Sequence, residues 1–238
     1  MTTPLRIAAS GDVHCVEPLR ERTGRAFAEV SGACDLVLLA GDLTAHGLPD
    51  EAAVLADACR RLSIPVLAVL GNHDHHSGRG EEVKEVLGEG GIVVLDRDHV
   101  ILEIGDSEVG VVGVKGFVGG FEGAEIANFG EPLLRQVHRE TTLEVEALER
   151  GLEAVAGCHK RIALLHYAPI TDTLVGEPET IWAFLGSGRL AGPIGMHRPD
   201  LVVHGHAHHG APRGAIGAVP VHNVAVHVTG RDFAFLEV

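Results

Sequence analysis

Aromatic and basic residues are both scarce in this chain of 238 residues. Phe, Trp and Tyr together make up 4%, and 19 Lys and Arg stand against 33 Asp and Glu, so the formal net charge is −14. The low aromatic content argues against a base-stacking surface, and an acidic chain is repelled by the phosphates of nucleic acids and anionic membranes. We therefore expect neither a nucleic acid nor a membrane as the main partner.

Long hydrophobic runs and closely spaced cysteine pairs are also lacking. A membrane-spanning helix needs about 20 consecutive apolar residues. The four cysteines lie far apart, at Cys15, Cys34, Cys59 and Cys158, which is typical of reduced structural thiols. The first residues lead straight into a strand-like run, without the charged and apolar regions of a secretory signal. We therefore predict a cytoplasmic protein.

The first 72 residues alternate regularly between short apolar runs and helical segments. The apolar runs predict buried strands at Leu5–Ser10, Leu36–Ala40 and Val66–Leu70. Between them, apolar residues at helical spacing predict helices over Pro18–Val30 and Pro49–Leu62, each with its proline in the first turn. Right-handed crossovers make the three strands parallel, so their carboxyl ends meet at one edge of the sheet.

The later part of the chain shows no repeat and no linker. Short β-rich runs separated by Asp/Gly turns predict a meander over Ile92–Leu95, His99–Ile104 and Glu108–Val114. We expect the Gly-rich stretch from Lys115 to Glu131 to pass over the site, and an amphipathic helix over Thr141–Ala156. Two further buried-type strands each lead into a histidine, at Arg161–Leu165 and Asp200–Val203. We predict a single α/β domain over residues 1–238.

Polar side chains follow the first three predicted strands at a regular interval. Asp12 and Asp42 are 30 positions apart, and Asn72 follows after another 30. A strand–helix–strand step takes roughly 30 residues, so these side chains emerge next to one another where α/β sheets bind ligands. Histidine is abundant, with 16 in total, and several follow the later strands. Carboxylates and imidazoles without a thiolate suit Mn, Fe or Zn rather than Mg or Ca.

Five motifs follow one another along the chain: Asp12-Val13-His14, Gly41-Asp42, Gly71-Asn72-His73-Asp74, His166, and Gly205-His206-Ala207-His208. Their order resembles that of the calcineurin-like metallophosphoesterase superfamily, and most of all its small bacterial phosphodiesterases. The resemblance implies a four-layer α-β-β-α sandwich of two facing mixed β-sheets flanked by helices. It also implies two metal sites that share Asp42. The first would be held by Asp12, His14, Asp42 and His208, and the second by Asp42, Asn72, His166 and His206.

The function implied by this resemblance is that of a dinuclear metal-dependent phosphoesterase. Two ions of Mn, Fe or Zn clamp a small phosphoester substrate and lower the pKa of a bridging water, so that a metal-bridging hydroxide attacks phosphorus. We expect His73 to assist the leaving group and Asp74 to orient its imidazole. A proton donor matters most for a poor leaving group, so His73 favours a diester or another ester with such a group. We predict a phosphodiesterase that acts on a cyclic nucleotide or another small phosphodiester.

Several alternatives remain open from the residues alone. The same site suits a phosphomonoesterase or a nucleotide pyrophosphatase, and the same fold could serve as a metal-free scaffold for protein binding. The motif order speaks against a metallohydrolase that cuts amides. Among the other histidines, His204 is in step with His206 and is a candidate for supporting the ligands, whereas His227 is expected on the surface or in the core.

Overall fold

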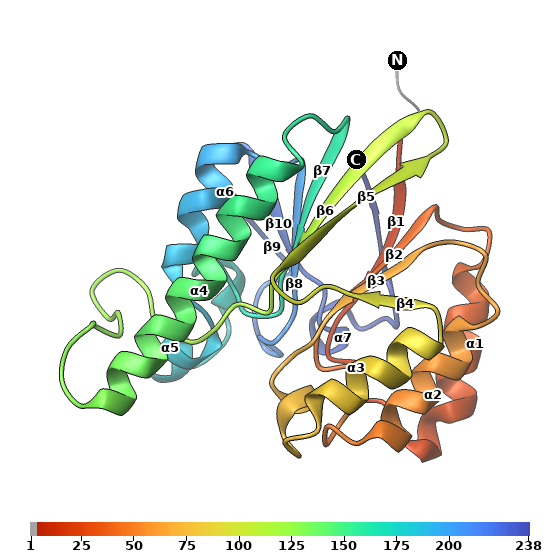
Figure 1. The fold of residues 1–238 in the computed structure, drawn as a ribbon, viewed down its shortest axis with the longest axis horizontal. Coiled ribbons are helices and arrows are strands. Elements are labelled where there is room, and N and C mark those ends of the chain that lie inside the picture. The colour runs from red at the N-terminus through yellow and green to blue at the C-terminus, as the bar shows by residue number, and fades with distance from the viewer. Residues whose placement is uncertain (1–3) are drawn as a thin grey trace.

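The computed structural model describes residues 4–238 and shows two facing β-sheets between two groups of helices (Figure 1). The first sheet has five strands in the order β11-β1-β2-β3-β4, and the second has six in the order β5-β6-β7-β8-β10-β9. Both sheets are mixed, because each combines parallel and antiparallel pairs. The predicted four-layer α-β-β-α sandwich is therefore confirmed.

The first sheet follows the predicted alternation of strands and helices. Its strands are β1 (Arg6–Ser10), β2 (Leu36–Ala40), β3 (Val66–Val69), β4 (Ile92–Val94) and β11 (Ala234–Glu237). Strands β1 to β4 pair in parallel in that order, and β11 pairs with β1 in the antiparallel direction. Three helices follow β1, β2 and β3 and lie together on one side of this sheet (Figure 1): α1 (Arg20–Val30), α2 (Pro49–Cys59) and α3 (Gly80–Glu89).

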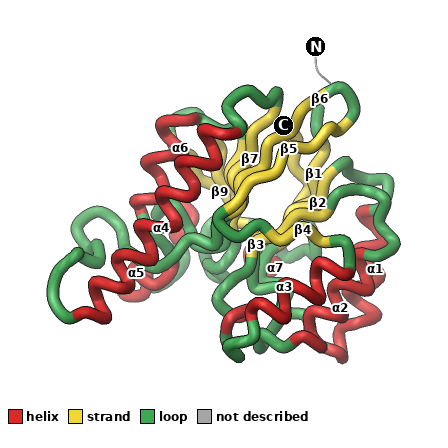
Figure 2. The backbone as a smooth tube through the Cα atoms, viewed as in Figure 1, coloured by secondary structure: helices red, strands yellow, loops and turns green. Residues whose placement is uncertain are grey.

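The second sheet is built from the rest of the chain. Its strands are β5 (Asp98–Ile104), β6 (Ser107–Gly113), β7 (Lys160–Leu164), β8 (Leu201–His204), β9 (Arg213–Ile216) and β10 (Val219–Asn223). Its helices are α4 (Pro132–Ala154), α5 (Trp182–Leu185) and α6 (Ala191–His197). The short helix α7 (Val226–Thr229) follows β10 and leads back to the first sheet. Figure 2 shows long loops connecting these elements.

The predicted meander is wrong in its first strand. Strand β4 pairs in parallel with β3 and completes the first sheet, and only β5 and β6 form an antiparallel hairpin, which begins the second sheet. The reason is α3, which the sequence analysis did not identify and which carries the chain from β3 to a parallel neighbour. Helix α4 also begins nine residues before the predicted start at Thr141, with Pro132 in its first turn.

Three clusters of apolar side chains form layers that alternate with the sheets. The inner faces of both sheets share one cluster, in which residues such as Ile7 and Leu38 meet residues such as Ile162 and Val203. The outer face of the first sheet packs against Phe27 and other residues of α1 to α3. A third cluster joins the outer face of the second sheet to α4 and α6. This packing fixes the strand ends of both sheets relative to each other.

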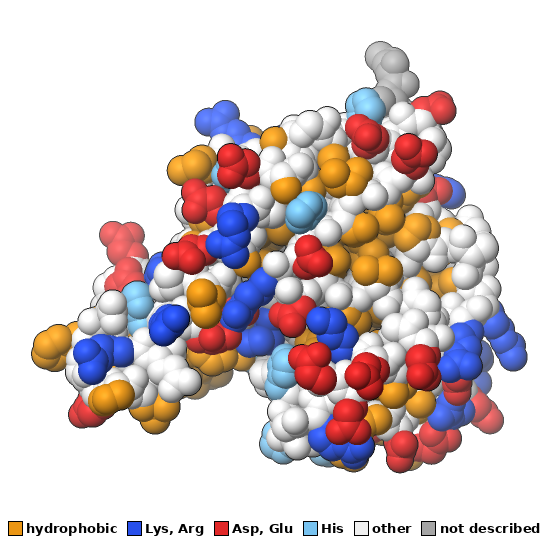
Figure 3. All heavy atoms as spheres, in the orientation of Figure 1, with side chains coloured by type: hydrophobic (Ala, Val, Ile, Leu, Met, Phe, Trp, Pro, Cys, Tyr) orange, Lys and Arg blue, Asp and Glu red, His pale blue; other side chains and the backbone are white. Residues whose placement is uncertain are grey.

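The surface carries mixed charge. On the face in Figure 3, acidic side chains lie among the basic ones over α2 and α3 at the lower right. Across residues 4–238, no helix is both long and apolar enough to cross a membrane. The four cysteines are free thiols, and three of them are buried.

Candidate metal centre

The residues of the five motifs lie together at the carboxyl ends of strands from both sheets. In the first sheet, Asp12, Asp42 and Asn72 each lie two or three residues beyond the end of β1, β2 or β3. The second sheet contributes histidines beyond the ends of β7 and β8, namely His166, His206 and His208. The cluster lies beside α7, between the two groups of helices (Figure 1). Residues up to 196 positions apart in the sequence thus come into contact.

These side chains form two groups that share one carboxylate. The first group consists of Asp12, His14, Asp42 and His208, and the second of Asp42, His166 and His206. Within each group, the potential ligand atoms all lie within 4.8 Å of one another. Asn72 belongs with the second group, because its Oδ1 lies 2.9 Å from His166 Nε2. The structure therefore brings together all seven residues that the sequence predicts as metal ligands.

Four of these residues have a backbone conformation that L-amino acids rarely adopt. The φ angles of Asp12, His14, Asp42 and His206 are 57°, 47°, 50° and 69°. Among the other non-glycine residues in the described part of the chain, only two have a positive φ. Such a conformation costs on the order of 1 kcal/mol per residue. Strain concentrated in one cluster indicates a functional site rather than a requirement of packing.

Hydrogen bonds to backbone carbonyls fix the tautomers of two imidazoles. His166 Nδ1 lies 2.8 Å from the Ala40 oxygen, and His206 Nε2 lies 3.2 Å from the Phe184 oxygen. A carbonyl oxygen only accepts hydrogen bonds, so these two ring nitrogens donate. The opposite nitrogen of each ring then carries a lone pair, which is the form that binds a metal. In His166 this nitrogen lies 3.3 Å from Asp42 Oδ1.

Burial favours the neutral form of three histidines in the cluster. It lowers the pKa of His14 to about 4 and that of His206 to about 3, and it moves the pKa of His166 well below its usual range. His208 differs, because its hydrogen bond to Asp12 raises its pKa. A neutral imidazole is the metal-binding form, so these three rings release no proton when they bind an ion.

Two carboxylates lie buried among these imidazoles. Asp12 and Asp42 are 0% and 1% exposed, and within residues 4–238 the ion pairs that they form are all with histidines. Burial raises the pKa of Asp12. A buried carboxylate costs several kcal/mol unless a cation compensates it. Two metal ions would provide that compensation, and the nitrogen and oxygen donors present fit Mn, Fe or Zn.

Gly71 allows the loop after β3 to approach the shared carboxylate closely. A Cβ atom at this position would lie 2.2 Å from Asp42 Oδ1 and 2.7 Å from His166 Nε2. Both distances are too short for non-bonded atoms, so a side chain here would displace the residues of the second group. The glycine before Asn72 in the third motif is therefore a requirement of the cluster itself.

His73 lies at the rim of the cluster, next to the shared carboxylate. Its backbone N–H donates to Asp42 Oδ1 at 2.8 Å, and its ring centroid lies 4.5 Å from that of His14. Its ring Nδ1 donates to the Ala45 carbonyl oxygen at 2.8 Å, which leaves the Nε2 position available 4.0 Å from Asp42 Oδ2. The side chain is 43% exposed, so a substrate can reach this nitrogen.

The prediction that Asp74 orients the His73 ring is wrong. Asp74 is fully buried, and its carboxylate accepts hydrogen bonds from the backbone N–H groups of Leu43, Thr44 and Gly71 and from the Thr44 hydroxyl. Burial raises the pKa of Asp74 to about 6, against the opposing effect of these hydrogen bonds. Asp74 therefore joins the loop after β3 to the loop after β2, and a backbone carbonyl orients the His73 ring instead.

We expect Asp74→Ala to lower the free energy of unfolding by about 3 kcal/mol or more, because it leaves three buried N–H groups without their acceptor. Urea unfolding of the metal-free protein measures this loss. Thr44→Val is the matched control, since it removes a single hydrogen bond to the same carboxylate and should cost about 1 kcal/mol. If Asp74→Ala were as stable as the wild-type protein, the carboxylate would not hold the two loops together.

His204 supports the segment that carries two of the candidate ligands. It is buried, and its ring nitrogens lie 2.8 Å from the Gly205 oxygen and 2.9 Å from Thr173 Oγ1. Burial lowers its pKa to about 4. Both nitrogens are thus occupied outside the cluster, so His204 fixes the turn before His206 and is not itself a candidate ligand.

Two residues beside the cluster could not be found from the motifs. The ring of His227 stacks on that of His208 with centroids 4.3 Å apart, and the ring of Tyr167 lies 4.4 Å from that of His206. Tyr167 directly follows His166 and is the single tyrosine of the chain, which is the one sequence clue to its position. His227 comes from α7, and its position depends on how the C-terminal segment returns past β1.

Comparison with known families agrees with this geometry. The profile of the calcineurin-like phosphoesterases matches residues 5–210, a range that contains all five motifs. The chain belongs to this family. Calcineurin-like phosphoesterases hydrolyse phosphoesters and depend on two metal ions, and the cluster provides residues that could hold those ions. No curated protein sequence matches this phosphoesterase significantly.

Solved structures share the fold of this calcineurin-like phosphoesterase at low sequence identity. Phosphopantetheinyl hydrolase from Mycobacterium tuberculosis has a TM-score of 0.68 and 16% identity, over 92% of this chain and 88% of its own. The protein TT1561 of Thermus thermophilus has a TM-score of 0.57 and 20% identity, over 98% of this chain and 99% of its own. A phosphatase from Mycoplasma pneumoniae has a TM-score of 0.56 and 14% identity, over 95% and 73%. At these identities the similarity establishes the fold alone.

Proposed function

We propose that this calcineurin-like phosphoesterase is a phosphodiesterase with a dinuclear metal centre, and that it acts on a cyclic nucleotide or another small phosphodiester. The ligands of the first ion are Asp12, His14, Asp42 and His208, and those of the second are Asp42, Asn72, His166 and His206. The metals are Mn, Fe or Zn, which suit nitrogen and oxygen donors. The compartment is the cytoplasm, in agreement with the four free thiols.

The two ions, when bound, polarise the phosphoryl oxygens and lower the pKa of a bridging water. The residues of the chain set the charge of this centre. Asp12 and Asp42 bring two negative charges, whereas Asn72 and the histidines are neutral donors. The loaded site is therefore positive and attracts an anionic ester despite the net charge of −14. Asp42 suits the bridging position because each of its two oxygens can bind one ion.

The observation that carries the proposal is the position of His73. Its Nδ1 is held by the Ala45 carbonyl, while its Nε2 lies at the open rim, 4.0 Å from the shared carboxylate. When the ring is protonated at both nitrogens, Nε2 can donate a proton from there to an oxygen that leaves phosphorus on the side of His14, and the neutral ring then keeps its proton on Nδ1. A diester with an alkoxide leaving group needs such a donor, because the alkoxide is a strong base. This requirement favours an ester with a poor leaving group, such as an alkyl phosphodiester, as the substrate.

We expect the purified protein to contain close to two metal ions per chain and to hydrolyse bis-(p-nitrophenyl) phosphate in the presence of Mn. Treatment with EDTA should abolish hydrolysis and lower Tm, because ions that bind only the folded state stabilise it by about 2.7 kcal/mol at 100 times their Kd. Addition of Mn should restore both. Elemental analysis, a nitrophenolate assay and thermal unfolding measure these three effects on the same sample.

A panel of substrates separates the alternatives. We expect faster turnover of cyclic nucleotides and linear diesters than of p-nitrophenyl phosphate or nucleotide pyrophosphates. A higher kcat/KM for a monoester or for a pyrophosphate would contradict the phosphodiesterase proposal. The same site would then be that of a phosphomonoesterase or of a nucleotide pyrophosphatase. A protein that binds much less than two ions per chain and cleaves no phosphoester would instead be a scaffold.

A further inference from the structure

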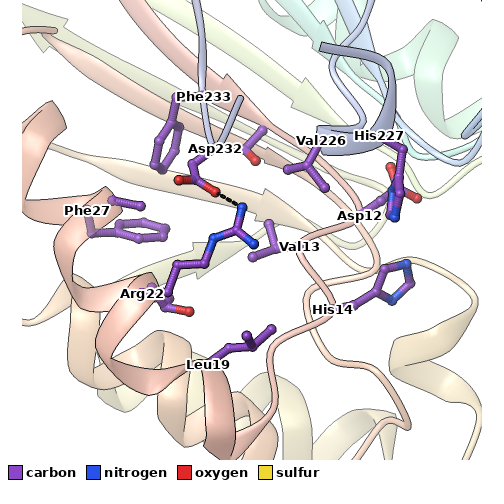
Figure 4. A pocket seen from close by; sticks show the side chains of 13 residues that line it. Asp12, Val13, His14, Leu19, Arg22, Phe27, Val226, His227, Asp232 and Phe233 are labelled. Carbon is purple, nitrogen blue, oxygen red and sulfur yellow. Dashed lines mark hydrogen bonds and ion pairs between the residues drawn. The ribbon is translucent and has the colours of Figure 1, made fainter. Parts of the chain in front are cut away.

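A cavity of about 230 Å³ adjoins the first group of candidate ligands. Figure 4 shows Asp12, His14 and His227 at one end of it and Phe27 and Arg22 toward the other. At the first end the accessible lining residues are His14 and His227, so the cavity adjoins the site where a phosphoester would bind. Its volume is several times the roughly 30 Å³ that one water molecule takes up in the liquid. The cavity is therefore large enough for a ring-sized organic group.

The walls of the cavity are mainly apolar. Phe27 and Phe233 meet edge to face with centroids 5.0 Å apart, and Val13 and Val226 lie between them and the metal ligands (Figure 4). Helix α1 contributes Ala26 and other small or apolar residues to the same wall. An aromatic pair beside aliphatic side chains is the usual lining of a pocket that binds an apolar or aromatic group.

One buried hydroxyl in the wall of this cavity lacks a hydrogen-bond partner. Ser10 is 1% exposed, and its Oγ has no partner within residues 4–238. A buried polar atom without a partner destabilises the folded state, and native proteins contain few of them. Ser10 lines the cavity two residues before Asp12, and its Oγ is inaccessible in this conformation, so a hydrogen-bonding group of a ligand in the cavity would reach the hydroxyl after a change of the Ser10 side-chain rotamer.

The charged side chains that line the cavity beyond the metal ligands neutralise each other. Arg22 and Asp232 form an ion pair at 2.6 Å, drawn as a dashed line in Figure 4. Their side chains are 62% and 44% exposed, so this end of the cavity lies at the molecular surface. A second phosphate in the cavity would find no unpaired cation among these lining residues and would lose its hydration beside Phe27, which is costly. The cavity therefore favours a neutral group.

We propose that this cavity is the subsite for a ring of the phosphodiester, either the second aryl group of a linear diester or the base of a cyclic nucleotide, and that this ring is compact, neutral and largely apolar and has one function that hydrogen-bonds to Ser10. This proposal rests on the proposed function and narrows it, because it selects diesters with an aromatic or heteroaromatic group over monoesters and over polyphosphates. His227, which stacks on His208, lines the end of the subsite next to the metal centre.

Two diesters with the same leaving group test this subsite. Bis-(p-nitrophenyl) phosphate carries a second aryl group, and methyl p-nitrophenyl phosphate carries a methyl group in its place. Ala26→Leu fills the cavity from α1, and we expect it to lower the ratio of kcat/KM between the aryl and methyl esters by about tenfold. The matched control is Ala28→Leu, the same change at an exposed position of the same helix outside the cavity, which should leave the ratio unchanged.

Ser10→Ala provides a second readout that does not depend on filling the cavity. We expect a higher Tm of the free protein, because the unpartnered hydroxyl is gone, together with a several-fold fall in the same ratio. If the ratio were the same in the wild-type protein, Ala26→Leu and Ser10→Ala, the subsite would be disproved while the phosphodiesterase would stand. If the wild-type protein with Mn hydrolysed neither ester, the proposed function would fail and the subsite with it.

Discussion

Replacing Asp42 by Asn should lower kcat/KM for phosphodiesters by at least about 10³-fold and reduce the metal content below two ions per chain. Asp42 is the one side chain that belongs to both groups of the cluster. An amide lacks the negative charge and the second anionic oxygen that a bridge between two cations requires. Steady-state kinetics with bis-(p-nitrophenyl) phosphate and elemental analysis of the same preparation measure both effects.

Asn is the informative substitution at this position because it should preserve the fold. Asp42 has φ 50°, a conformation that Asn tolerates better than most residues, and the Asn Oδ1 can still accept the His73 N–H. Asp42→Ala should be at least as inactive but also removes that hydrogen bond. Asp50→Asn, an exposed change in the first turn of α2, should retain full activity. Wild-type activity in Asp42→Asn would overturn the dinuclear mechanism.

Most of the first sheet could be predicted because its strands are buried on both faces. The continuous apolar runs of β1, β2 and β3 and the intervening helices follow directly from the sequence pattern. Strand β4 was misplaced because a run of three residues contains too little pattern to reveal its partner. Its pairing with β3 depends on α3, which the sequence analysis did not identify and whose two glycines are poor helix formers. Local pattern therefore predicted the elements better than their pairing.

The sequence also predicted which residues come together in the candidate site, but not the contacts that support them. The interval between Asp12, Asp42 and Asn72 reflects a repeated strand–helix unit, which places all three at one edge. The role of Asp74 depends on backbone N–H groups, and every residue except proline has one, so no sequence pattern marks them as its partners. His227 likewise depends on the path of the C-terminal segment. The chemical type of each side chain can be predicted from the sequence, whereas its hydrogen bonds to backbone groups can be identified only once the fold is known.

The loss of kcat that results from replacing His73 should depend on the leaving group of the ester. In the proposed mechanism it donates a proton from Nε2, a contribution that is typically worth about 10²- to 10⁴-fold for a leaving group that departs as a strong base. A p-nitrophenolate ion is stable without a proton, so its departure gains little from an acid. We therefore expect His73→Gln to lower kcat for a cyclic nucleotide or an alkyl diester by about 10²-fold or more, but to lower kcat for bis-(p-nitrophenyl) phosphate by less than about tenfold.

This difference between esters separates proton donation from a structural role. The His73 N–H that binds Asp42 belongs to the backbone and is retained in the Gln variant, so the shared carboxylate keeps this contact. His99→Gln, the same change on the β5–β6 hairpin, is the matched control and should affect neither class of ester. Kinetics across a series of leaving groups of increasing basicity should give a steeper dependence for His73→Gln than for the wild-type enzyme. An equal loss for all esters would assign His73 to phosphate binding, because a charge or hydrogen bond on the phosphoryl group acts regardless of which oxygen departs.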